Sequence, residues 1–164
     1  MIIAIHGGPE AQERPGFRLV YQYWVNELGA VVITPNIRGS DGYGRSYLAL
    51  DNGVKRQDAV ADVGALLDWI ARQPGLDANR VVVACGSYGG FMTLSAFARY
   101  GDRLAGAYDI VGMSNLVTFL EHTEAYRRDL MVRRLSAGGR WIRTSSTRAP
   151  CDGTEPRICR CLPP

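Results

Sequence analysis

The sequence has 164 residues, of which 46% are hydrophobic and 21% are charged, and its formal net charge is +3. This length and balance predict one globular domain with a sizeable core and exclude an intrinsically disordered chain. No apolar run approaches the roughly 20 residues of a membrane-spanning helix, and no secretory leader pattern is seen, so we expect a cytoplasmic protein without a membrane partner.

Short apolar strands alternate with amphipathic helices over residues 1–132. The predicted strands are 2–6, 30–36, 80–85 and 104–112, and the predicted helices between them are 16–29, 54–75 and 88–101. The side chains expected to be buried are Val20, Trp24 and Leu28 on the first helix, and Val60, Val63, Leu67 and Ile70 on the second. Apolar strands joined by helices indicate an α/β fold, a mainly parallel sheet with helices on both faces.

Ser87 lies between the end of the third predicted strand and the start of the third predicted helix. Ser87 lies in CGSYGG, close to the G-x-S-x-G pattern of a nucleophile on a sharp turn with small residues two positions away on each side. Gly89 fits this pattern, whereas Cys85 replaces the first glycine and is expected to crowd the turn slightly. A phosphate-binding turn is the alternative, but neither a Walker sequence nor G-x-G-x-x-G is present. The pattern therefore favours Ser87 as a catalytic nucleophile.

A second glycine-rich turn, HGGP at residues 6–9, follows the first strand. Because the carboxyl ends of parallel strands meet at one edge of a sheet, we expect this turn to lie beside Ser87. A serine nucleophile needs hydrogen-bond donors for the oxyanion, and the backbone N–H groups of Gly8 and Tyr88 are the candidates. The glycines at positions 7 and 8 leave the backbone accessible. Taken alone, HGGP could equally be a plain turn at a strand end.

Five segments carry a family resemblance in sequence order: IIAIHGGPEAQERPGF, VVITPNIRGSDGYGRSYLALDNG, DAVADVGALLDWI, GSYGGFMTL and DIVGMSNLVTFLEHTEAYRRDL. Together they resemble the catalytic α/β-hydrolase domain of the prolyl oligopeptidase family, in particular its acylaminoacyl-peptidase and dipeptidyl-peptidase-like members. The resemblance implies a serine peptidase that hydrolyses short peptides through an acyl-enzyme on Ser87. It implies the amides of Gly8 and Tyr88 as oxyanion donors, and no metal or cofactor.

The resemblance also implies roles for residues around the site. Residues 36–44 match a family loop that shapes the mouth of the site, and Arg38 is expected to brace the HGGP loop without touching substrate. His6 and Gly7 belong to the oxyanion loop. His6 is expected to orient this loop and not to act as the general base.

Other family features are not found. Relatives carry a β-propeller and the first hydrolase strands before the HGGP strand, so we expect this hydrolase domain to be truncated at both ends. In this fold the catalytic acid and then a histidine follow the serine. His122 lies in FLEHTEAYRRDL, which is predicted to be a charged surface helix, and Asp109 is expected to stabilise a strand end or turn. Without an identifiable acid and base, the chain alone is expected to be inactive.

Residues 133–164 form a tail that differs from the preceding 132 residues. It holds seven arginines against Asp152 and Glu155, whereas residues 1–132 hold 12 basic and 14 acidic side chains. No helical stripe continues beyond Leu135, so the tail is predicted to be disordered. Its composition is also typical of a shifted reading frame in a GC-rich gene.

Two functional interpretations of the tail remain as alternatives. A nucleic-acid arm would use the arginines, but Trp141 is its only aromatic residue. A metal site would use three tail cysteines, but C-x-x-C spacing and histidine are lacking. These cysteines are Cys151, Cys159 and Cys161. We therefore expect neither a nucleic-acid partner nor a bound metal.

Three functions stay open from the sequence. The favoured one is an incomplete serine peptidase domain over residues 1–132, with a peptide substrate. The second is a non-catalytic or pseudoenzyme domain kept for binding. The third is a carboxylesterase, because the same serine and oxyanion loop can act on esters.

Overall fold

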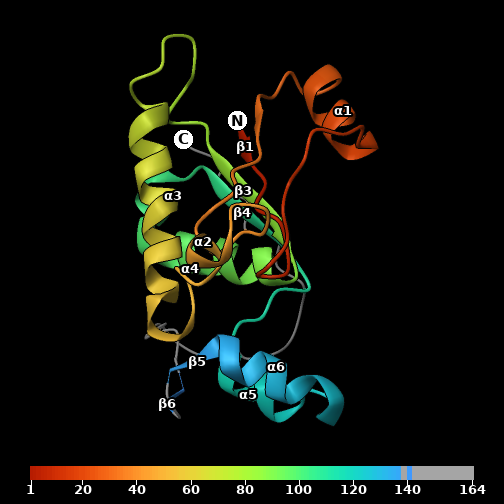
Figure 1. Ribbon diagram of the computed structural model, residues 1–164. Helices are drawn as coiled ribbons and strands as arrows, with labels where there is room; N and C mark the ends of the chain where they lie inside the picture. Colours follow the sequence, from red (N-terminus) through yellow and green to blue (C-terminus); the bar gives the residue numbers. More distant parts are fainter. Residues whose placement is uncertain (138–139, 142–164) are drawn as a thin grey trace, which may run out of the picture.

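The computed structural model describes residues 1–137 and 140–141, and its centre is a parallel β-sheet (Figure 1). The strands are β1 (Ile2–Ile3), β2 (Val32–Ile33), β3 (Val82–Gly86) and β4 (Gly106–Ile110), in the order β2-β1-β3-β4. All three pairings are parallel, and Ile2 lies opposite Val32 on one side and Val82 on the other. The predicted α/β fold with four parallel strands is confirmed.

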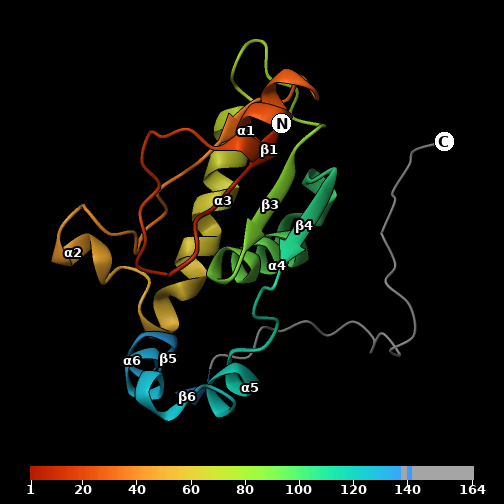
Figure 2. The same cartoon turned by 90° about the vertical axis from the view of Figure 1, so that its right-hand side faces the viewer.

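Two long helices, α3 (Arg56–Ile70) and α4 (Tyr88–Tyr100), cover one face of the sheet (Figures 1 and 2). The four predicted core positions of α3 are all buried: Val60, Val63, Leu67 and Ile70. They pack in one apolar cluster with strand residues such as Ile3 and Val83. This cluster fixes the sheet edge from which the site is built, because it anchors both β3 and the helix that follows it.

The first helix, α1 (Leu19–Asn26), lies on the side of the sheet away from α3 and α4 (Figure 1). The prediction that it buries a stripe is wrong for the described residues. Val20 is 48% exposed and Leu28, which lies beyond the end of the helix, is 57% exposed. A groove of about 900 Å³, bordered by Tyr21 and Trp24, separates α1 from the sheet, so the helix does not pack closely on it.

Short elements connect and follow the main ones. They are α2 (Arg45–Leu48), η1 (Gly53–Lys55), η2 (Gly101–Arg103), α5 (Leu116–Glu121), α6 (Ala125–Leu135), β5 (Ser136–Ala137) and β6 (Arg140–Trp141). The helices α5 and α6 lie beyond the carboxyl ends of β3 and β4 (Figure 2). Leu116 and Leu120 of α5 belong to the core cluster, so α5 packs against the carboxyl-end edge of the sheet.

The single surface helix predicted over residues 119–130 is in fact broken between α5 and α6. At the break, the Thr123 hydroxyl donates to the Phe119 carbonyl at 2.6 Å, and His122 Nδ1 lies 2.7 Å from the Thr118 carbonyl. Both side chains thus bond carbonyl groups in the last turn of α5, and the Thr118 carbonyl also accepts the His122 backbone N–H at 3.1 Å. These contacts accompany the end of α5 at Glu121.

The tail predicted for residues 133–164 lies largely outside the described residues. Within them, α6 continues past position 132 to Leu135, which is buried at 1% exposure, and β5 pairs with β6 in antiparallel fashion. The proposed disorder and frame shift concern the remainder and stay predictions. Among the described residues, none of the helices has the length and apolar character needed to cross a bilayer.

Candidate active site

Ser87 stands at a sharp turn between β3 and α4, as the sequence predicts. Its backbone adopts φ 57° and ψ −122°, a positive-φ conformation that residues other than glycine rarely take. Its N–H donates to the Ile110 carbonyl of β4 at 3.0 Å, which ties the turn to the sheet. The side chain makes no capping hydrogen bond to α4, and the residue is exposed. The fold thus leaves the hydroxyl available above the sheet edge.

The close approach of strand and helix depends on Gly89. A Cβ added to Gly89 would lie 2.3 Å from the Ile5 carbonyl oxygen and 2.9 Å from Cys85 Cβ. Such separations are far inside van der Waals contact, so only glycine fits. The sequence argument for a small residue at this position is therefore supported by the packing.

Cys85, at the position where the nucleophile pattern has glycine, is buried in β3. The Ile5 N–H donates to its Sγ at 2.9 Å, so the thiol takes part in joining β1 to β3. Burial raises the pKa of the Cys85 thiol above its ordinary value of 9.0. The thiol is therefore a neutral packing group at physiological pH, and the turn accommodates it.

We expect the native chain to protect Cys85 from alkylation. At pH 8 iodoacetamide should modify it roughly 100-fold or more slowly than in urea, because only the thiolate reacts and the site must first open. Peptide-resolved mass spectrometry measures this rate apart from the three tail cysteines. Because the folded-state pKa is raised, the thiol's contribution to stability is present below pH 9.0 and declines as the pH rises above it. Equal rates in buffer and in urea would contradict this burial.

The HGGP loop lies directly beside Ser87. A Cβ added to Gly7 would be 3.5 Å from Ser87 Cβ and 3.8 Å from Ser87 Oγ. Gly8 has φ 131°, and a Cβ there would lie 2.5 Å from the Glu10 backbone nitrogen, so this position requires glycine. The structure thus brings Gly7, Gly8 and Ser87 together, with Tyr88 next in the chain. The assignment of the Gly8 and Tyr88 amides as oxyanion donors stays a prediction.

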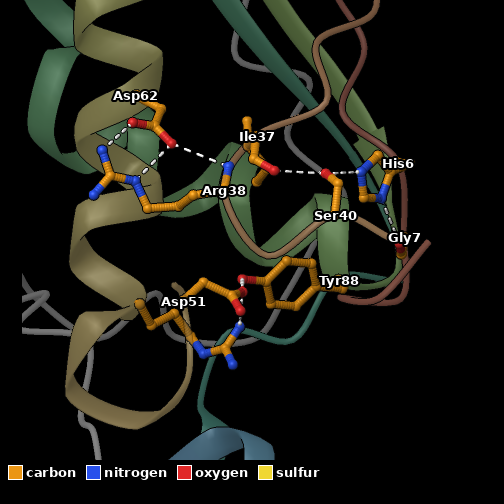
Figure 3. Close-up of polar contacts among 9 residues, drawn as sticks. His6, Gly7, Ile37, Arg38, Ser40, Asp51, Asp62 and Tyr88 are labelled. Carbon is orange, nitrogen blue, oxygen red and sulfur yellow. Dashed lines mark hydrogen bonds and ion pairs between the residues drawn. The ribbon is translucent and has the colours of Figure 1, made fainter. Parts of the chain in front are cut away.

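The His6 ring is engaged on both sides by loop groups (Figure 3). Its Nδ1 lies 2.8 Å from the Gly7 carbonyl and its Nε2 lies 2.7 Å from Ser40 Oγ, which is 2.6 Å from the Ile37 carbonyl. Because a carbonyl only accepts, the contact at Nδ1 is a hydrogen bond that the ring donates to Gly7. Both ring nitrogens therefore face groups other than Ser87, a geometry suited to orienting the loop.

Arg38 contacts α3, and not the HGGP loop as expected. Its Nε and Nη2 donate to the two Asp62 carboxylate oxygens at 2.8 and 2.5 Å, and this hydrogen bonding raises the pKa of Arg38 (Figure 3). The expected bracing role is thus corrected, because the Arg38 side chain points away to α3. Sequence analysis missed Ser40, which contacts His6 instead. The sequence signal for this contact is that RGS, at residues 38–40, follows β2, and β2 pairs with β1, the strand before HGGP.

Ser87 opens into a cleft of about 410 Å³. Gly8 and Pro9 of the HGGP loop line one side of it, and residues from the end of β4 through α6 line the other. The apolar members of that second wall are Val111, Met113, Phe119, Met131 and Leu135. The same wall also holds His122, Thr123, Glu124 and Arg127. A cleft with apolar side chains beside an exposed hydroxyl can hold a substrate side chain while its carbonyl meets the serine.

His122 lies in the wall of this same cleft. It is exposed, as predicted, but the sequence did not indicate that it shares a cavity with Ser87. Its Nδ1 contacts the Thr118 carbonyl, and no hydrogen bond joins His122 to the Ser87 hydroxyl within residues 1–137. The structure therefore places the histidine near the site without the pairing that a general base requires.

Asp109 stabilises the turn after β4, as the sequence predicts. Its Oδ2 accepts a hydrogen bond from the Gly112 N–H at 3.3 Å. Its carboxylate also lies over the start of α4, where a Cβ added to Gly90 would be 2.1 Å from Asp109 Oδ1. The carboxylate therefore has a local structural role.

A comparison with protein families matches the model of the prolyl oligopeptidase family to residues 15–140, which is most of the chain. The chain belongs to the prolyl oligopeptidase family. This confirms the family resemblance, and the matched residues include the RGS and nucleophile-turn motifs, whereas HGGP at residues 6–9 lies before them. In this family the β3–α4 turn described above has the form of the nucleophile turn of an α/β hydrolase.

Curated relatives in the prolyl oligopeptidase family are much longer than this chain. It is 31% identical over 159 residues to dipeptidyl aminopeptidase BIII of Pseudoxanthomonas mexicana, covering 91% of this chain and 23% of the relative. It is 29% identical over 125 residues to the acylamino-acid-releasing enzyme of Mus musculus, covering 76% and 17%. The chain thus spans about a fifth of the length of these relatives.

Solved structures agree with the family. A puromycin-hydrolysing peptidase of Mycobacterium tuberculosis superposes with a TM-score of 0.66 at 29% identity, over 82% of this chain and 21% of that structure. A prolyl endopeptidase superposes with a TM-score of 0.75 at 20% identity, over 83% and 19%. The second match shows the α/β-hydrolase fold.

Proposed function

We propose that Ser87 is the nucleophile of a serine peptidase that cleaves short peptides through an acyl-enzyme. The observation that carries this proposal is the strained backbone of Ser87, with φ 57°, which presents an exposed hydroxyl to a cleft shared with the HGGP loop. Both curated relatives named above are peptide-processing enzymes by name, which favours a peptide over an ester as substrate.

The chemistry follows from the two loops. Attack by Ser87 Oγ on the substrate carbonyl places negative charge on the carbonyl oxygen, and backbone N–H groups stabilise that charge. We assign these donors to Gly8, whose glycine-only conformation leaves the amide uncovered, and to Tyr88, at the first position of α4. The positive end of the α4 dipole adds to the stabilisation. The general base takes the serine proton and gives it to the departing nitrogen, so collapse of the tetrahedral intermediate expels the amine and leaves the acyl group on Ser87. Water then hydrolyses this ester and restores the serine hydroxyl.

The described residues provide no general base that is hydrogen-bonded to Ser87. The sequence has two histidines, of which His6 is held by Gly7 and Ser40, and His122 makes no hydrogen bond to Ser87 within residues 1–137. We propose that the triad histidine and acid, together with a propeller, belong to the additional length that the relatives carry. The nucleophile and the oxyanion donors are then the contribution of this segment.

A non-catalytic binding domain is the second candidate. It is favoured by the absence of a hydrogen-bonded base at the Ser87 hydroxyl in the described part of the chain. Such a domain would use the apolar wall of the 410 Å³ cleft to hold a peptide without cleaving it.

Labelling with a fluorophosphonate probe separates the two candidates. We expect slow covalent labelling over hours that is lost in Ser87→Ala and kept in Ser46→Ala, a variant of an exposed serine outside the cleft. Without the base, an oxyanion hole alone leaves roughly 10³–10⁴-fold acceleration over water. Intact-mass spectrometry measures the label. Absence of labelling, or equal labelling of the Ser87→Ala variant, would favour the binding domain.

A further inference from the structure

A fully buried ion pair lies beneath the nucleophile turn, and the mechanism above makes no use of it. Asp51 and Arg56 are 1% and 0% exposed, and Arg56 Nη1 lies 3.1 Å from Asp51 Oδ2. Asp51 lies in the connection between β2 and α3, and Arg56 is the first residue of α3. Burying two charges costs solvation that their attraction roughly offsets, so such a pair adds little net stability. We therefore look for its role in the neighbouring side chains that the ion pair holds in place.

The third member of this cluster is the side chain of Tyr88, which is itself fully buried. The Tyr88 hydroxyl donates to Asp51 Oδ2 at 3.0 Å and accepts a hydrogen bond from Arg56 Nη1 (Figure 3). The Arg56 guanidinium also lies 4.9 Å from the centre of the Tyr88 ring, and the ring stacks on Phe91. The side chain of the residue after the nucleophile is thus fixed at its hydroxyl and on its ring.

The Tyr88 hydroxyl contacts the same carboxylate oxygen as Arg56. The second carboxylate oxygen, Asp51 Oδ1, is buried without a hydrogen-bond partner in the described residues, so Oδ2 carries the contacts of this carboxylate. Gly39 packs against the same carboxylate, where a Cβ would lie 2.2 Å from Asp51 Cγ. In such a dry site a hydroxyl that both donates and accepts is strongly held.

The connection between β2 and α3 also holds the other half of the site. Ser40, from the same connection, bonds the His6 ring, and that ring bonds the Gly7 carbonyl of the HGGP loop. Residues 37–51 therefore contact the Gly8 side of the site through Ser40 and the Tyr88 side through Asp51. Two donors stabilise one oxyanion only if both lie about 2.7–3.1 Å from it. A single connection that contacts both loops helps to keep both donors at that distance.

We propose that Asp51 and Arg56 are positioning residues, which fix the Tyr88 backbone N–H relative to Gly8 by anchoring the Tyr88 hydroxyl. The proposal rests on the function proposed above for Ser87. It extends that function by assigning a role to a polar cluster that never touches substrate. It also explains why an ion pair is kept in the core directly behind the turn.

The test compares two tyrosines at opposite ends of α4 in the full chain. Tyr88→Phe removes the hydroxyl from the cluster, whereas Tyr100→Phe removes one from the far end of the helix. The first readout is ¹⁵N relaxation of the backbone amides of residues 86–89. We expect the order parameters there to fall from about 0.85 toward 0.6 in Tyr88→Phe and to stay unchanged in Tyr100→Phe. Asp51→Asn, which keeps the shape of the side chain, replaces Tyr88→Phe if that variant does not fold.

The second readout is the labelling rate of Ser87 with a fluorophosphonate and with its P=S analogue. Sulfur is a poor acceptor for oxyanion donors, so a displaced Tyr88 amide should lower the oxygen-to-sulfur rate ratio about tenfold or more. A loss of folded protein would lower both rates equally. Rigid amides together with an unchanged rate ratio in Tyr88→Phe would overturn the positioning role. A wild-type chain unlabelled at Ser87 would instead refute the proposed function, and the relaxation data would still decide whether the cluster orders the turn.

Discussion

We expect the Gly89→Ala variant to lose about 3 kcal/mol or more of its free energy of unfolding. In an ordinary helix this change stabilises by roughly 0.5–1 kcal/mol, because alanine has less backbone freedom to lose than glycine. Here the added Cβ would lie 2.3 Å from the Ile5 carbonyl oxygen and 2.9 Å from Cys85 Cβ. To relieve this overlap, α4 must move away from β1 and carry the Ser87 turn with it. Urea unfolding followed by circular dichroism measures the loss.

The matched control for this variant is Gly101→Ala, just beyond the other end of α4. Gly101 has φ −60°, and a Cβ there would meet only Phe97 at 3.8 Å, which is ordinary contact. We therefore expect Gly101→Ala to change the free energy of unfolding by less than about 1 kcal/mol. A Gly89→Ala variant as stable as the wild type would show that the strand and helix do not approach as described.

The second large effect concerns turnover. We expect this chain to hydrolyse a peptide p-nitroanilide at no more than roughly 10³–10⁴ times the uncatalysed rate, because removing the base of a serine triad leaves only binding and the oxyanion hole. A complete triad adds a further factor on the order of 10⁶ in kcat. The reason is that a serine hydroxyl is a weak nucleophile until a neighbouring base takes its proton. Release of p-nitroaniline, compared with the Ser87→Ala variant, measures the rate.

The His122→Ala variant tests whether His122 acts as the general base in this reaction. His122 lines the cleft but makes no hydrogen bond to Ser87 within residues 1–137, so its removal should leave the slow reaction unchanged within about twofold. Rapid turnover of the wild type that disappears in both Ser87→Ala and His122→Ala would identify His122 as the base. In that case the proposed supply of the histidine by further polypeptide would be wrong.

The sequence by itself determined the parallel sheet and the place of the nucleophile. Apolar strands separated by helices favour parallel pairing, because a parallel pair needs a crossover connection and a helix provides one. Gly8 and Gly89 mark backbone positions without room for a side chain, and this requirement is local enough to be seen in the sequence. The serine, its turn and the neighbouring loop were therefore predictable.

Only the tertiary structure decided the partners of the polar side chains. Arg38 pairs with Asp62, while Ser40, two residues later, contacts His6. The Tyr88 hydroxyl meets Asp51, 37 positions away in the chain. Nothing in the local pattern tells whether Arg38 or Ser40 contacts the HGGP loop, because the choice depends on distances between segments set by the packing of α3 and α4.

The same reason applies to the elements that differ from expectation. The apolar stripe of α1 satisfies helical periodicity, yet its burial depends on how closely the sheet face approaches, and a groove of about 900 Å³ separates them. His122 belongs to a charged segment typical of a surface helix, yet the break between α5 and α6 turns it into the cleft beside Ser87. Periodicity in the sequence determined which residues form helices and strands, whereas the distances between those elements, fixed by core packing, determined which side chains meet.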